Sequence, residues 1–325
     1  VFMLTILPMS GGYHMNLMRA ESPGPSVERF VPTVKSTAKI LYGIYICLSL
    51  LELLLLLVGK MPMFDALTLT FGTAGTGGFG IKNDSIGSYT TYQQTVITIF
   101  MILFGVNFNV YFLFLLKKIR QGLKNEELRA YLGIILGAIL LITVNIAGKF
   151  GNPFLAFHHA AFQVGSIITT TGYSTVDFNT WPTFSKTVLV LLMLIGASAG
   201  STGGGIKVSR IVILAKSVKK ELKQYLHPHS ISKIKMDGKP VEHEVVRSIN
   251  VFLIAYLLIY AVSMLIVSLD NFDFTTTFTS VAATINNIGP GLDLVGPAAN
   301  FGILSVPSKL VLIFDMLAGR LELFP

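Results

Sequence analysis

Residues 71–80 read FGTAGTGGFG, and the last six of them spell G-x-G-x-x-G, the pattern of a dinucleotide-binding turn. Such a turn requires a strand before it, a helix after it and an acidic residue about 20 positions later. The segment before it, residues 64–73, is apolar, the polar loop IKNDS follows, and residues 85–125 contain no Asp or Glu. The stretch therefore predicts a helix of about half a membrane's thickness that ends in a glycine-rich loop, rather than a nucleotide site.

The same layout occurs twice more along the chain. Residues 157–174 read FHHAAFQVGSIITTTGYS, and residues 274–291 read FTTTFTSVAATINNIGPG. In each copy a short segment rich in Thr, Ser and aromatic residues ends in a tract with one alignable glycine, which is Gly78, Gly172 or Gly289. A further apolar helix follows each tract. Three copies in parallel orientation imply rotational pseudo-symmetry about the membrane normal.

The composition is that of a membrane protein, because 52% of the 325 residues are hydrophobic and 13% are charged, with a mean hydropathy of +0.67. Apolar runs near or above the roughly 20 residues of a membrane span cover residues 40–58, 95–116, 131–147 and 249–269. Most basic residues lie in three segments between the spans, which we expect in the cytoplasm, so that the glycine tracts face outside. No aromatic-interleaved basic module accompanies them, and no nucleic-acid partner is expected.

The three tracts have the composition of an ion selectivity filter. Non-helical backbone at membrane depth is tolerated where it is buried or lines a watery cavity, and a cation entering there exchanges water for carbonyl oxygens. Glycine allows the left-handed conformations that turn successive carbonyls to one side. The predicted filter residues are Thr76, Gly77, Gly78 and Phe79, then Thr170, Thr171, Gly172 and Tyr173, and finally Asn287, Ile288, Gly289 and Pro290. The first two residues of each tract are the expected potassium ligands, namely Thr76, Gly77, Thr170, Thr171, Asn287 and Ile288. The alternative is that Gly and Thr serve helix packing.

A second glycine-rich stretch, residues 194–208, reads LIGASAGSTGGGIKV. A phosphate-binding P-loop that begins at Gly200 would need Lys at position 206, where Ile206 stands. The glycines instead predict a break within an apolar span at residues 187–214, and broken membrane helices line ion pathways. These glycines are Gly196, Gly200, Gly203, Gly204 and Gly205. Close helix contact is their alternative role.

Arg320 lies deep in the apolar segment 310–324. An arginine in such a segment is costly, which makes it a functional hypothesis by default. A fixed positive charge beside a pore is a barrier to a cation, with Asp315 and Glu322 as possible partners. The alternative is an anchor that reaches the lipid headgroups from the end of the helix.

The chain resembles the Trk/Ktr/HKT superfamily of potassium transporters over essentially its whole length. The resemblance is carried by these motifs and by three further segments: RAESPGP at residues 19–25, GASAGSTGGGIK at 196–207 and AGRLELF at 318–324. The resemblance is strongest to the bacterial TrkH/TrkG subunits. It implies an all-α membrane protein of repeated helix/pore-loop/helix units around a pseudo-fourfold pore, with the first unit largely absent from this chain. The implied divisions are the end of the first unit's inner helix (1–19), a cytoplasmic connection (20–39), the second unit (40–118), a cytoplasmic loop (119–130), the third unit with a broken inner helix (131–216), a basic cytoplasmic loop (217–246) and the fourth unit, cut short at its end (247–325).

The resemblance also implies how the protein works. The loop 196–207, with Lys207 and Arg320, is the expected gate below the filter, and potassium is the ion that is carried. No organic cofactor and no covalent chemistry are expected on this chain. The implied setting is a multi-pass protein of the bacterial inner membrane that contacts membrane lipid and forms a homodimer. A cytosolic nucleotide-binding regulatory subunit of the TrkA type is expected to dock near residues 216–247 and to bind nucleotide in place of this chain.

Two alternative functions stay open from the sequence. A sodium-permeable or non-selective cation channel of the same fold differs in the first filter tract, which this chain does not contain. A membrane enzyme or assembly subunit whose glycine loops bind a phosphate group predicts affinity for nucleotide or lipid phosphate. Channel-like passage and symport are likewise not distinguished.

Overall fold

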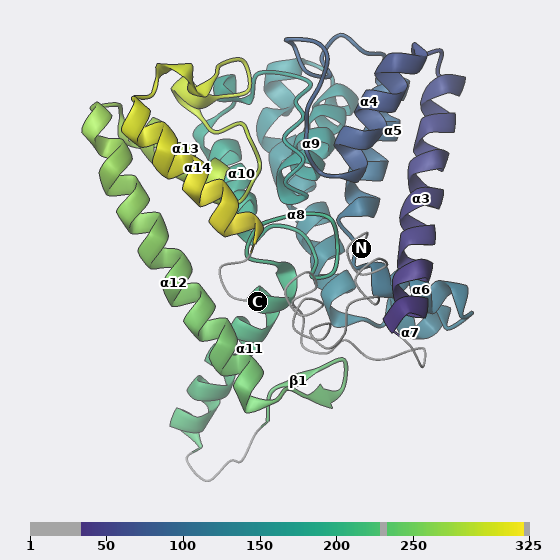
Figure 1. Ribbon diagram of the computed structural model, residues 1–325, viewed down its shortest axis with the longest axis vertical. Coiled ribbons are helices and arrows are strands. Elements are labelled where there is room, and N and C mark those ends of the chain that lie inside the picture. Colours follow the sequence, from purple (N-terminus) through teal and green to yellow (C-terminus); the bar gives the residue numbers. More distant parts are fainter. Residues whose placement is uncertain (1–33, 228–232, 322–325) are drawn as a thin grey trace.

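The computed structural model describes residues 34–227 and 233–321 (Figure 1). The main helices are α3 (Val34–Val58), α4 (Met63–Ala74), α5 (Thr91–Phe104), α6 (Phe108–Leu115), α7 (Ile119–Leu123), α8 (Glu126–Phe150), α9 (Pro153–Ile168), α10 (Thr183–Ile195), α11 (Val208–Leu226), α12 (His243–Val267), α13 (Phe274–Ile285) and α14 (Val306–Arg320). Two short strands, β1 (Lys235–Met236) and β2 (Lys239–Pro240), form an antiparallel hairpin. Short 3-10 turns are η2 (Phe178–Thr180), η3 (Ser268–Asp270), η4 (Asp293–Val295) and η5 (Phe301–Ile303). The expectations for residues 1–33 and for Glu322 lie outside the described residues.

The helices form three successive groups, each a long helix, a short helix and then one or two further helices. In Figure 1 the purple and blue group α3–α6 and the green and yellow group α12–α14 flank the teal helices α8–α10. Contacts of α5 with α9 and of α10 with α13 join the central group to its two neighbours. The short helices α4, α9 and α13 lie in the upper half of this view, while α7, α11 and the hairpin lie at the opposite end. This arrangement places all three short helices in the same half of the molecule.

Three of the described helices, α3, α8 and α12, are long and apolar enough to cross a membrane. The pair α5 and α6 passes the same test together but is bent by 89° between its two parts. Leucines on α3 such as Leu50 and Leu54 are exposed, as expected of side chains that face lipid. The chain is therefore a multi-span membrane protein.

The apolar run at residues 95–116 is not one continuous helix, because the helix breaks at residues 105–107. The side chain of Asn107 caps the new helix α6 by accepting a hydrogen bond from the Asn109 N–H at 2.9 Å. Gly105 lies against Tyr131, whose hydroxyl oxygen would be 2.2 Å from a Cβ at this position. The carbonyls freed by the break accept hydrogen bonds from Ser198 and Thr202, far along the chain. The break is stabilised by these tertiary contacts, which hydrophobicity alone does not reveal.

Each group of helices encloses its own apolar cluster. Ile142 and Val164 are buried between α8 and α9, Leu69 and Ile97 between α4 and α5, and a third cluster lies among α12, α13 and α14. In a bilayer such clusters stabilise the fold through close van der Waals packing, since lipid is as apolar as the side chains. The separate clusters are consistent with the three repeated units.

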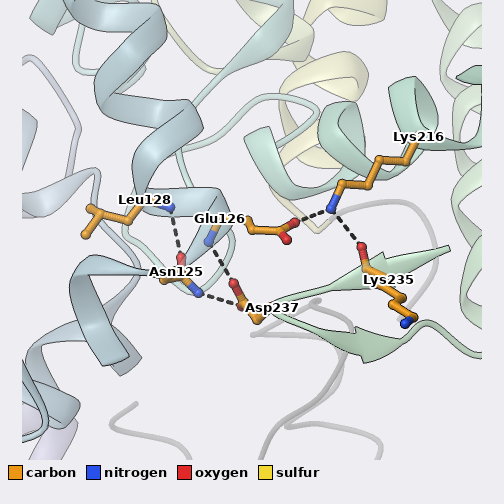
Figure 2. A network of polar contacts seen from close by, with 6 residues as sticks. All are labelled: Asn125, Glu126, Leu128, Lys216, Lys235 and Asp237. Carbon is orange, nitrogen blue, oxygen red and sulfur yellow. Dashed lines mark hydrogen bonds and ion pairs between the residues drawn. The ribbon is translucent and has the colours of Figure 1, made fainter. Parts of the chain in front are cut away.

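The segment 217–246, expected as a basic loop, contains the end of α11, the hairpin and the start of α12. Figure 2 shows how the hairpin docks on the start of α8. One carboxylate oxygen of Asp237 accepts from the Glu126 backbone N–H at 2.7 Å, and the other accepts from the Asn125 side chain at 2.8 Å. Lys216 of α11 pairs with the Glu126 carboxylate and donates to the Lys235 carbonyl at 2.7 Å. The hairpin therefore joins α11 to the first turn of α8.

Asp237→Ala should lower the free energy of unfolding by about 1 kcal/mol, because it removes an acceptor from the free N–H groups at the start of α8. The measurement is the thermal unfolding of the purified protein in detergent. Glu221→Ala is the control, since Glu221 is exposed and makes only a 3.8 Å ion pair with Lys220. Equal melting temperatures for the two variants would contradict the docking role of Asp237.

Candidate functional site

The three tracts share one backbone conformation. The first residue of each has a positive φ, +50° at Thr76, +58° at Thr170 and +56° at Asn287. The glycine two positions later is also left-handed, with φ of +66°, +87° and +104° for Gly78, Gly172 and Gly289. Left-handed backbone at the third position favours glycine, because other residues place a Cβ too close to the carbonyl. The repetition seen in the sequence is thus a repetition of geometry.

The N–H groups of the tracts are used by the short helices that precede them. Gly77 and Gly78 both donate to the Gly72 carbonyl of α4, at 2.8 and 3.3 Å. The equivalent N–H groups of Thr171 and Gly172 donate to the Ser166 carbonyl of α9 at 2.9 and 3.4 Å, and Ile288 donates to Ala283 of α13 at 2.8 Å. This is the pattern of a Schellman motif, in which a left-handed residue ends a helix. A phosphate group would need these same N–H groups unbonded.

The carbonyl oxygens at the first two positions of each tract, unlike the N–H groups, are not used in hydrogen bonds between described residues. Within the described ranges, no hydrogen bond reaches the carbonyl oxygens of Thr76, Gly77, Thr170, Thr171, Asn287 and Ile288. Four of these residues are buried, and Thr170 and Thr171 are fully so. Buried carbonyls are almost always paired with a donor, with water or with an ion. These oxygens can therefore coordinate a cation.

Neighbouring tracts lie in direct contact. A Cβ at Gly78 would be 1.8 Å from the Thr171 carbonyl oxygen, and one at Gly172 would be 1.9 Å from the Ile288 oxygen. The Tyr173 hydroxyl donates to the Phe79 carbonyl at 3.3 Å, which joins two tracts at their fourth residues. Nothing in the described part of the chain comes within 4 Å of a Cβ at Gly289. The Phe79 side chain is exposed and Pro290 is half-buried.

The non-helical residues 196–207, here called the glycine loop, contact the first two tracts and the residue just before the third. The Thr202 carbonyl accepts from the Thr76 hydroxyl at 2.8 Å, and the Gly204 N–H donates to the Thr170 hydroxyl at 2.7 Å. A Cβ at Gly203 would be 2.9 Å from the Thr169 oxygen, and one at Gly204 would be 2.7 Å from the Asn286 oxygen. The loop therefore lies against the first residues of the tracts, at the end nearest their short helices.

The glycine loop connects the end of α10 to the start of α11, and its two ends lie close together. The Lys207 and Val208 N–H groups donate to the Ile195 and Ala197 carbonyls at 2.9 and 3.0 Å. Its turns use positive φ at Gly196, Gly200, Gly205 and Lys207, between +65° and +83°. The Lys207 ammonium donates to the Gly203 carbonyl of the same loop. Lys207 thus supports the backbone of the loop, unlike the phosphate-binding lysine of a P-loop.

Arg320, the last residue of α14, contacts the glycine loop at Thr202. Its guanidinium donates to the Thr202 carbonyl at 3.2 Å, so this one oxygen receives hydrogen bonds from Thr76 and Arg320. Asp315, a possible partner of Arg320 from the sequence, instead accepts from the Ser263 hydroxyl of α12 at 2.7 Å. Sequence reasoning missed Thr202, because a backbone acceptor has no signature beyond its place in a glycine-rich stretch.

At the start of α13, the Asp273 carboxylate caps the helix by accepting from the Thr275 and Thr276 N–H groups at 2.8 and 3.2 Å. Partial burial raises the pKa of Asp273, but the hydrogen bonds from Thr276 and Thr275 outweigh it and hold the pKa below its ordinary value. A lowered pKa means that this stabilisation is present above the ordinary pKa of the unfolded chain and is lost as the pH falls through the folded value. The cap therefore keeps its charge at neutral pH.

Comparison with known proteins agrees with this geometry. The TrkH family model, described as a cation transport protein, matches residues 1–150 and 152–325. The Trk system potassium uptake protein TrkH of Salmonella typhimurium is 36% identical over all of this chain and 68% of its own length. TrkG of Escherichia coli is 32% identical over all of this chain and 67% of its own length. The crystal structure of the potassium transporter TrkH from Vibrio parahaemolyticus matches with a TM-score of 0.83 at 34% identity, over 93% of this chain and 65% of that chain. The chain thus spans about two thirds of the length of these relatives.

Proposed function

Because the chain belongs to the TrkH family of cation transport proteins, we propose that the full-length protein takes up potassium through a filter of backbone carbonyls. The family consists of transporters rather than enzymes, and potassium transport is the function that this membership supports. The observation that carries the filter is the set of tract carbonyls that receive no hydrogen bond from any described residue, beside N–H groups that are already bonded. That combination suits a cation and opposes an anion.

Potassium passes the filter by exchanging hydration water for these oxygens. The ligands are the carbonyls of the first two residues of each tract: Thr76, Gly77, Thr170, Thr171, Asn287 and Ile288. Left-handed backbone at two positions of every tract lets neighbouring oxygens face the same side. The contact between Gly172 and the Ile288 carbonyl fixes the spacing of adjacent tracts, which supports selectivity for one ion size or field strength.

The glycine loop is the gate of this pathway. It contacts the first residues of two tracts and the residue before the third, and its Thr202 carbonyl accepts hydrogen bonds from Thr76 and from the charged Arg320. In this arrangement the loop lies across the path from the filter to the cytoplasm. Passage requires the loop to move, which its glycine-rich backbone permits.

The setting of the protein follows from the same premise. The relatives are named as parts of a Trk system, which supports a multi-component assembly. We place the protein in the bacterial inner membrane as a homodimer, with its basic segments in the cytoplasm and the filter entrance outside. A nucleotide-binding subunit of the TrkA type docks on the cytoplasmic end near α11 and the hairpin.

Uptake of potassium into proteoliposomes that contain the full-length protein tests the proposal. We expect potassium influx that a tenfold excess of sodium reduces only weakly, since the carbonyl cage is matched to potassium. Empty liposomes are the control. Equal influx of both ions would favour the poorly selective channel of the same fold, and absence of any cation flux would reject the proposal.

A further inference from the structure

Two consecutive glutamates begin α8, and they have different surroundings. Acidic residues in the first turn of a helix commonly lie at the surface and stabilise the helix by interacting with its dipole. Glu126 does so at the docked hairpin, where it pairs with Lys216. Glu127 points into the protein, with only 4% of its surface exposed. A buried carboxylate is costly unless its partners are well placed, which makes its contacts informative.

The Glu127 carboxylate joins three separate elements. One oxygen accepts from the Ala199 backbone N–H of the glycine loop at 2.6 Å. The other accepts from the Asn107 side chain, at the break between α5 and α6, at 3.1 Å. The Ser209 backbone at the start of α11 and the Lys207 charge also lie near this carboxylate. The glycine loop and the broken helix thus meet at one side chain.

Backbone contacts run along the same junction. The Ser198 N–H donates to the Gly105 carbonyl at 3.1 Å, and the Phe108 N–H donates to the Gly200 carbonyl at 3.1 Å. The backbone of the glycine loop is therefore hydrogen-bonded to the helix break. Glu127 adds a buried charge to these neutral hydrogen bonds, and charge-assisted bonds are about twice as strong.

We propose that Glu127 is a positioning residue that holds the glycine loop against the filter, by fastening Ala199 to the break at Asn107. This inference rests on the proposed gating role of the loop. A neutral amide at position 127 has one acceptor oxygen in place of two and gives no charge to Lys207. Losing about one charge-assisted hydrogen bond shifts the balance between the closed and open loop roughly tenfold toward open.

The test compares Glu127→Gln with Glu126→Gln in the full-length protein. Both variants remove one negative charge from the first turn of α8, but only position 127 contacts the loop. Basal potassium flux is measured in proteoliposomes, together with the flux ratio of potassium to sodium. A second readout is the rate at which a thiol reagent modifies a Ser201→Cys probe in the loop, with Cys47 replaced by Ser.

For Glu127→Gln we expect basal flux and probe modification both to rise about tenfold, with an unchanged ion ratio. Glu126→Gln should leave all three measurements unchanged, because Glu126 pairs with Lys216 and not with the glycine loop. A general loss of fold would not raise the flux of Glu127→Gln while leaving its ion ratio unchanged. Equal behaviour of the two variants would overturn the proposal.

Asn107→Asp provides a second variant if Glu127→Gln fails to fold. It keeps the oxygen that caps α6 but places a carboxylate opposite Glu127, so it should open the loop in the same direction. Unchanged probe modification in this variant would also overturn the proposal. If the unaltered protein conducts no potassium, the proposed function fails, whereas the labelling experiment still decides the role of Glu127.

Discussion

Gly172→Ser should abolish the preference for potassium over sodium and reduce potassium flux by at least about tenfold. A Cβ at position 172 would be 1.9 Å from the Ile288 carbonyl oxygen, which is far inside van der Waals contact. The backbone must also hold φ at +87°, which costs a residue other than glycine roughly 1–2 kcal/mol. Both problems are relieved only if the two tracts separate, and this movement enlarges the site in which the ion is held.

The measurement is isotope uptake into proteoliposomes with potassium and sodium in competition. Gly133→Ser is the matched control, because Gly133 lies in α8 with nothing within 4 Å of an added Cβ. It should insert, fold and conduct as the unaltered protein does. Retained selectivity in a well-folded Gly172→Ser protein would remove the tract at residues 170–173 from the filter and would favour a packing role for the repeated glycines.

The short helices and their glycine tracts could be predicted from the sequence because their determinants are local. Each short helix is apolar over half a span. Each is followed by a tract in which two residues have a left-handed backbone, and the second of them is a glycine, the residue that adopts this conformation most easily. The break at residues 196–207 follows from five glycines in one membrane segment. In these places composition, turn chemistry and position along the chain all point to the same structure.

The remaining features depend on contacts between distant residues. The break after Phe104 lies in an apolar run, and the loop donors that satisfy its carbonyls come from more than 90 residues away. Glu127 and Ala199 are 72 positions apart, and nothing in the pair Glu126–Glu127 says which member turns inward. Membrane hydrophobicity determines which segments are embedded, whereas pairing of backbone groups inside the protein determines where they break.

Arg320→Ala should raise basal potassium flux by about tenfold, because it frees one side of the glycine loop and removes a positive charge from the ion pathway. The guanidinium donates to the Thr202 carbonyl at 3.2 Å, and a hydrogen bond from an exposed charged group such as this one contributes about 0.5–1.5 kcal/mol. The Thr76 hydroxyl remains on the same oxygen at 2.8 Å, so the loop is loosened rather than released. A cation that passes the filter then meets a lower electrostatic barrier.

Flux through proteoliposomes without a regulatory partner is the appropriate measurement, since it isolates the resting state of the gate. Lys309→Ala is the control on the same helix, because Lys309 donates to the Gly302 carbonyl near the other end of α14 and does not contact the loop. Arg320→Lys separates the effect of charge from that of geometry. It keeps the positive charge but lacks the planar guanidinium that donates to the Thr202 carbonyl. We expect its flux to lie between those of the unaltered protein and Arg320→Ala. If Arg320→Ala is well folded and its flux is unchanged or lower, Arg320 is an anchor at the membrane surface, and the contacts of Thr76, Thr170 and Glu127 must hold the gate without it.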